Sequence, residues 1–134
     1  MSVLIERLVT ESGYPVATLD TIDDLVSSNE FLVLFFTNDP TRYPETNDVA
    51  VILPQLQNAF GNRFQVALVD RNSEQALKER YAFNQWPALV ILRRGTQLEV
   101  ISKVRDWAEY RSIIEPLLSA DSQSDQRIPN VSLS

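Results

Sequence analysis

The chain lacks the two residue types on which most thiol and imidazole chemistry depends. Its 134 residues include no cysteine, no histidine and one methionine. Without cysteine there are no disulfides, thiolate nucleophiles or structural zinc sites of the usual kind, and without histidine the commonest general base is missing. The sequence therefore excludes thiol redox chemistry, and we expect no metal site and no cofactor.

Long apolar runs are also missing. The longest, residues 31–36, is far shorter than the roughly 20 residues that a helix needs to cross a bilayer. Glu6 and Arg7 interrupt the first apolar stretch, which does not resemble a secretory signal. We therefore expect no membrane insertion and a cytoplasmic location.

Positive charge is scarce in the first half of the chain. Residues 1–60 carry a net charge of −7 and residues 61–134 a net charge of +1, which gives −6 overall. Nucleic acids and anionic membranes are bound through basic surface, so neither is an expected partner. The acidic half favours a cationic partner, although it can equally serve solubility alone.

Apolar periodicity predicts alternating helices and strands. A continuous apolar β-rich run such as residues 31–36 is typical of a central strand covered on both faces. We predict a mixed sheet of four to five strands between helices, in one domain over residues 1–118, and a disordered tail over residues 119–134. The predicted helices lie in 3–12, after Asp20 or Thr21, around Pro54, in 73–82 and after Asp106, and the predicted strands in 14–18, 31–36, 64–70, 87–92 and 98–104.

From about Phe31 to Leu118 the pattern resembles thioredoxin. A buried strand is followed by a helix containing Pro54, Trp86-Pro87 opens a later strand, and Gly95 lies in a hairpin turn. The resemblance implies an α/β thioredoxin-like three-layer sandwich and a cis bond before Pro87. Counted back from Pro54, the thioredoxin thiol pair falls on Thr46 and Val49.

A second resemblance covers nearly all of the part expected to be ordered. Residues 39–48 read D-P-x-R-x-P-E-x-x-D and residues 107–109 read W-A-E. Both are similar to the HyaE/HupG hydrogenase-expression family. This resemblance implies a redox-inactive chaperone in nickel–iron hydrogenase maturation that binds the twin-arginine signal peptide of the hydrogenase small subunit precursor.

Five residues are the candidate partner-binding site: Asp39, Glu45, Asp48, Trp86 and Pro87. The three carboxylates suit guanidinium groups, and the aromatic ring suits the apolar stretch that follows the arginines of such peptides. Each residue also has a structural explanation, since Asp39 is a turn former, Asp48 lies where a helix starts and Trp86 can pack inward.

Two other functions are compatible with the sequence to different degrees. The chain can be a scaffold that docks on another folded hydrogenase accessory protein or subunit. An enzyme is not expected, because we find no catalytic constellation and the paired Asp23-Asp24 lies in the first turn of a predicted helix, where helix capping and the helix dipole explain it.

Overall fold

The computed structural model describes residues 3–127, and the side chains of residues 3–119. The chain divides into two compact units, the first ending at Val104 and the second beginning at Arg105. The prediction of one domain over residues 1–118 stays a prediction.

The first unit contains four α-helices, one short 3₁₀ helix and five strands. These are α1 (Val3–Thr10), β1 (Val16–Ala17), α2 (Ile22–Ser28), β2 (Phe31–Phe36), α3 (Glu45–Ala59), β3 (Gln65–Val69), η1 (Arg71–Ser73), α4 (Glu74–Tyr81), β4 (Ala88–Arg93) and β5 (Thr96–Ser102).

The five strands form one mixed sheet in the order β1-β3-β2-β4-β5. The pairs β1–β3 and β2–β3 are parallel, whereas β2–β4 and β4–β5 are antiparallel. Strand β2 lies at the centre and every one of its residues is buried, as a run that is apolar on both faces predicts. The mixed α/β sheet expected from the sequence is confirmed.

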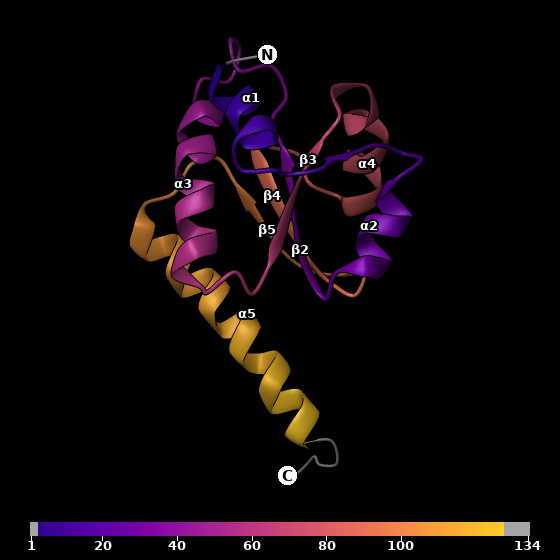
Figure 1. Ribbon diagram of the computed structural model, residues 1–134, viewed down its shortest axis with the longest axis vertical. Helices are drawn as coiled ribbons and strands as arrows, with labels where there is room; N and C mark the ends of the chain where they lie inside the picture. The colour runs from indigo at the N-terminus through magenta and orange to yellow at the C-terminus, as the bar shows by residue number, and fades with distance from the viewer. Residues whose placement is uncertain (1–2, 128–134) are drawn as a thin grey trace. The chain divides into compact units, whose positions relative to one another are not determined.

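Helices cover both faces of the sheet (Figure 1), with α1 and α3 on one side and α2 and α4 on the other. Alternate residues of a strand point to opposite faces, so Leu32, Leu34 and Phe36 share one face. They belong to a buried cluster that also includes Ile22 of α2 and Leu77 of α4. The layers therefore follow from the strand period and the apolar stripes of the helices.

The second unit contains helix α5 (Trp107–Arg127). Asp106 Oδ1 accepts the Glu109 N–H at 2.9 Å, which confirms the predicted cap. The helix continues past Ser119, where the sequence analysis placed the start of a disordered tail. Between Pro116 and Arg127 there is no glycine or proline to stop it, so the helix can propagate without an apolar face. The expected tail over residues 128–134 lies outside the described residues.

Among the described residues, no helix combines the length and the apolar character needed to traverse a lipid bilayer.

Candidate functional site

The segment before β4 leaves backbone groups unpaired. The Trp86–Pro87 bond is cis, as the resemblance to thioredoxin predicted. Pro87 is buried, and its carbonyl accepts the Lys103 N–H at 2.7 Å. Within residues 3–127, no hydrogen bond reaches the backbone N–H or carbonyl of Trp86. An extended peptide can pair with such groups as an added strand.

The Trp86 ring lies half-buried against the core. Its centroid is 5.1 Å from the ring of Phe83, in an edge-to-face arrangement, and 6.3 Å from the ring of Phe36. Such aromatic contacts fix the orientation of the indole. The part of the ring left in solvent therefore forms a rigid apolar surface.

A hollow of about 210 Å³ opens beside this ring. We call it the Trp86 depression, and its lining residues are Tyr43, Asn84, Gln85, Trp86 and Lys103. It brings together the loop that precedes α3 and the loop that precedes β4. Aromatic rings, side-chain amides and one ammonium group are available there, a combination that suits an apolar or main-chain segment of a peptide.

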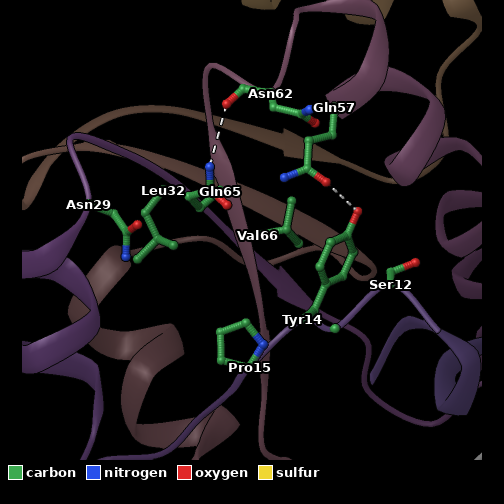
Figure 2. Close-up of a pocket in the computed structure, with 10 residues that line it drawn as sticks. Ser12, Tyr14, Pro15, Asn29, Leu32, Gln57, Asn62, Gln65 and Val66 are labelled. Atoms are coloured by element: carbon green, nitrogen blue, oxygen red, sulfur yellow. Dashed lines mark hydrogen bonds between the residues drawn. The ribbon is translucent and has the colours of Figure 1, made fainter. Parts of the chain in front are cut away.

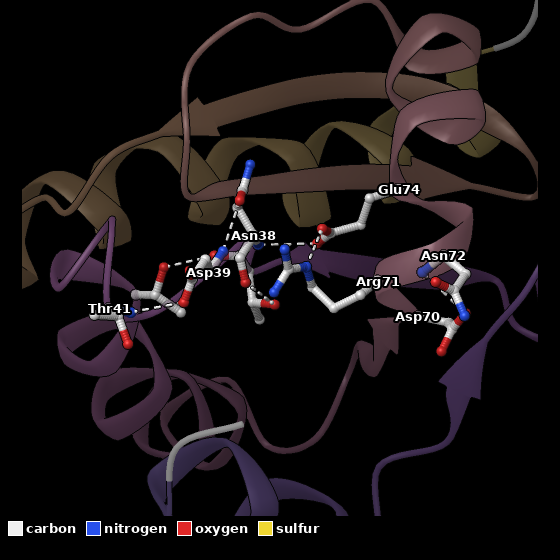
Figure 3. A network of polar contacts seen from close by, with 9 residues as sticks. Asn38, Asp39, Thr41, Asp70, Arg71, Asn72 and Glu74 are labelled. Atoms are coloured by element: carbon white, nitrogen blue, oxygen red, sulfur yellow. Dashed lines mark hydrogen bonds and ion pairs between the residues drawn. The ribbon is translucent and has the colours of Figure 1, made fainter.

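The loop before α3 is held in place by a buried carboxylate (Figure 3). Glu74 is 4% exposed, and its Oε2 accepts the Asn38 N–H at 3.0 Å. Its Oε1 lies 3.2 Å from Arg71 Nε. Asn38 has φ of 51°, a left-handed conformation that asparagine tolerates better than most residues. Glu74 therefore fixes the point at which the chain leaves β2 and turns into the loop.

Burial raises the pKa of Glu74 above its ordinary value. The Asn38 N–H bond and the nearby Arg71 guanidinium act in the opposite direction and only partly offset the loss of solvation.

Asp39 is engaged within this loop. Its Oδ1 accepts the Thr41 N–H at 3.0 Å, and its carbonyl accepts the N–H groups of Arg42 and Tyr43 at 3.0 and 2.8 Å. These bonds form a turn of the kind that aspartate favours, so the structural explanation of Asp39 has direct support. The Arg42 guanidinium lies over the Tyr43 ring, 5.7 Å from its centroid.

Glu45 and Asp48 lie in the first turn of α3, where negative charge is favourable. Glu45 is half-buried and Asp48 is exposed. No ion pair between either carboxylate and Arg42 is found in the described part of the chain. Neither residue lines the Trp86 depression, so the structure does not gather the five candidate residues into one pocket.

No three acidic side chains among the described residues are grouped so that they could hold a metal ion.

A family model described as hydrogenase-1 expression protein HyaE matches residues 4–110 of the chain. The chain belongs to the HyaE family of hydrogenase expression proteins. The matched residues include both loops of the Trp86 depression.

Named relatives agree with this assignment. The hydrogenase expression/formation protein HoxO of Azotobacter vinelandii is 43% identical over 129 residues, which cover 96% of this chain and 86% of the relative. The protein HupG of Rhizobium leguminosarum bv. viciae is 39% identical over 124 residues, 90% of this chain and 83% of the relative.

Solved structures support the fold. A hupG hydrogenase expression/formation protein from Rhodopseudomonas palustris CGA009 has a TM-score of 0.57 at 35% identity and covers 81% of this chain and 98% of its own. Mitochondrial thioredoxin 3 from Saccharomyces cerevisiae has a TM-score of 0.65 at 17% identity, over 78% of this chain and 96% of its own, which supports the fold alone. This HyaE-family protein is thus a hydrogenase expression/formation protein with a thioredoxin-like fold.

In this HyaE-family protein Thr46 and Val49, which occupy the two thiol positions of the thioredoxin pattern, are buried residues that support the fold. Thr46 is completely buried, and its hydroxyl donates to the Thr37 carbonyl at 2.7 Å. Val49 is buried in the core. The first turn of α3 is therefore held by a buried hydrogen bond and by core packing at the positions where a redox protein has reactive cysteines.

Five residues that line or support the Trp86 depression were not singled out by the sequence analysis: Tyr43, Glu74, Asn84, Gln85 and Lys103. Tyr43 stands at an unspecified position of the D-P-x-R-x-P-E motif, so the motif did not mark it. Glu74 opens a helix and reads as a solvent-exposed charge, and Lys103 follows a strand with no distinctive neighbour. Their roles depend on contacts between distant segments, which no local pattern encodes.

Proposed function

We propose that this HyaE-family protein is a cytoplasmic, non-enzymatic chaperone that binds the twin-arginine signal peptide of the hydrogenase small subunit precursor. The observation that carries the proposal is the unpaired backbone of Trp86 beside an open depression, in a thioredoxin-like fold that contains no cysteine. A groove of this kind keeps its capacity to pair with a peptide when no thiol is present.

In the proposed complex the apolar part of the signal peptide lies in the Trp86 depression. Its main chain pairs with the N–H and carbonyl of Trp86, and its apolar side chains contact the rings of Trp86 and Tyr43. Aromatic side chains are common anchors at protein–peptide interfaces, because they bury much area at little entropic cost.

The arginines of the peptide lie outside the depression. Lys103 contributes a positive charge to the depression and disfavours a guanidinium there. Glu45 follows Tyr43 by two residues, so its backbone lies at most about 7 Å from that of Tyr43. Glu45 and Asp48 are three residues apart on one helix and share a face, which suits the pairing of carboxylates with guanidinium groups.

The test is a titration of a fluorescein-labelled twin-arginine hydrogenase signal peptide, followed by anisotropy. Trp86→Ala should weaken binding about tenfold or more, the usual cost of removing a central aromatic anchor. Asp48→Asn should weaken it about two- to fivefold, as expected for an exposed charge pair. Asp24→Asn, an equivalent change on α2, is the matched control and should leave the affinity unchanged.

Equal affinity for a peptide with both arginines changed to glutamine would contradict the proposal. An inert signal peptide, combined with recovery of a folded hydrogenase accessory protein or subunit in a pull-down, would favour the scaffold function instead.

A further inference from the structure

A second pocket lies beside the start of β2, and Figure 2 shows the uncharged polar side chains that make up most of its lining. Its volume is about 340 Å³. We call it the amide pocket. Its polar lining residues are Ser12, Tyr14, Asn29, Gln57, Asn62 and Gln65.

The amide pocket is remote from the Trp86 depression. Leu32, at the start of β2, lies in its wall, whereas Phe36 at the other end of β2 pairs with Ala88, beyond which Trp86 lies. The four residue steps from Leu32 to Phe36 along an extended strand span about 13 Å. One short ligand therefore cannot fill both sites.

Part of the lining is held rigidly. Tyr14 is buried, and its hydroxyl donates to Gln57 Oε1 at 2.9 Å. Gln57 Nε2 donates to the Phe64 carbonyl at 3.0 Å, so both ends of this amide are fixed. Burial raises the pKa of Tyr14 to about 12, so the phenol remains a neutral donor even at alkaline pH. Such preorganisation lowers the entropic cost of binding.

Other groups of the lining are left for a ligand. Asn29 Nδ2 donates to the Leu25 carbonyl, and Gln65 Nε2 to the Asn62 carbonyl at 3.4 Å. Within the described residues, no partner is found for Asn29 Oδ1, Gln65 Oε1, the Ser12 hydroxyl or the Asn62 side-chain amide. The pocket thus offers acceptors and donors together, and its lining residues carry no ionised group that could compensate a buried charge.

We propose that the amide pocket is a second binding site, which accepts an uncharged, amide-bearing segment of a polypeptide. Main-chain and Asn or Gln side-chain amides present the matching set of donors and acceptors. The Tyr14 ring is buried and gives no exposed face for stacking a sugar or a base. Ser12, Pro15, Asn62 and Gln65 are exposed, so the pocket is open to solvent and a chain can continue beyond it.

The experiment is a ¹H–¹⁵N NMR titration of the full chain with two probes, acetyl-Gly-Asn-Gly-amide and its charged analogue acetyl-Gly-Asp-Gly-amide. The neutral probe should give saturable shifts of the side-chain NH₂ signals of Asn29, Asn62 and Gln65 and of the Gly13 amide. The charged probe should bind about tenfold more weakly, because no ionised lining residue compensates the charge of its carboxylate.

Substitutions in the lining test whether the neutral probe binds in the amide pocket. Asn62→Asp and Gln65→Glu add a charge at exposed lining positions without a change of shape, and each should abolish the shifts of the Asn29 side-chain NH₂ and the Gly13 amide, which both variants retain. Gln55→Glu, the same chemical change on the exposed side of α3, is the control and should leave them intact. Shifts that map to Trp86 and Lys103, equal binding of both probes, no saturable shifts, or binding that survives Asn62→Asp and Gln65→Glu would overturn the proposal.

Discussion

The buried carboxylate of Glu74 accepts a hydrogen bond from the loop before α3, so its protonation state affects the stability of the fold. Because its pKa is raised, the folded state holds the proton more tightly than the unfolded chain does. Its contribution to stability is therefore greatest below the ordinary pKa of 4.5 and declines as the pH rises through the raised value.

Glu74→Gln should remove this decline while it keeps an acceptor for the Asn38 N–H. Urea unfolding from about pH 4 to pH 7 should show the free energy of unfolding of the variant rising relative to that of the native protein. Glu79→Gln, an exposed change on the same helix, should show no such trend. Parallel curves for the native protein and Glu74→Gln would refute this role.

Tyr14 provides a second test at the residue scale. With a pKa of about 12 in the fold and 10.0 as its ordinary value, this phenol should ionise late in a titration followed by phenolate absorbance. Stability should fall as the pH rises from about 10 toward 12, because unfolding then releases a proton. Burial also raises the pKa of Tyr81, so Tyr14→Phe should remove one late-titrating phenol and leave another. The substitution should cost about 1 kcal/mol of stability through the lost bond to Gln57.

A buried hydrogen bond from the Thr46 hydroxyl to the Thr37 carbonyl ties the first turn of α3 to the residue that follows β2. Thr46→Val keeps the side-chain shape but leaves that carbonyl without its donor. We expect a loss of about 1–3 kcal/mol in the free energy of unfolding, measured by denaturant titration. Thr41→Val, at an exposed position of the same loop, should change stability little.

The elements differ in how far the sequence determines them. Strand β2 was predictable because six consecutive apolar residues fit only a strand covered on both faces. The cis bond before Pro87 followed from the resemblance to thioredoxin, not from propensity. The extension of α5 to Arg127 was not predicted, because residues 119–127 have no apolar pattern to indicate a helix. A helix that is already nucleated adds one backbone hydrogen bond for each further residue, so it can continue where a new helix would not start.

The candidate site was less predictable than the fold. Trp86 was named because it precedes the proline of the resemblance, yet its orientation depends on Phe36 and Phe83 from other segments. The amide pocket gave no signal at all, because isolated Asn, Gln and Ser residues occur on every protein surface. Only the parallel pairing of β2 with β3 brings Leu32 beside Gln65.

At the scale of the whole molecule, the acidic first half should make signal-peptide binding depend on salt. The Debye length falls from about 10 Å at 0.1 M to about 3 Å at 1 M ionic strength. Affinity for the twin-arginine peptide should therefore fall several-fold over that range in the anisotropy assay. The peptide with both arginines changed to glutamine should show little salt dependence, and a similar slope for both peptides would refute the electrostatic contribution.

The hydrogen bond of the Thr46 hydroxyl bears on whether a cysteine could function at this position. Sulfur is a weak donor, so a cysteine at this position would hold the Thr37 carbonyl poorly and would itself lie sealed from reagents. A cysteine at this position would thus weaken the hydrogen bond that holds the start of α3. Disulfide exchange is therefore opposed by the packing of this position as well as by the absence of cysteine.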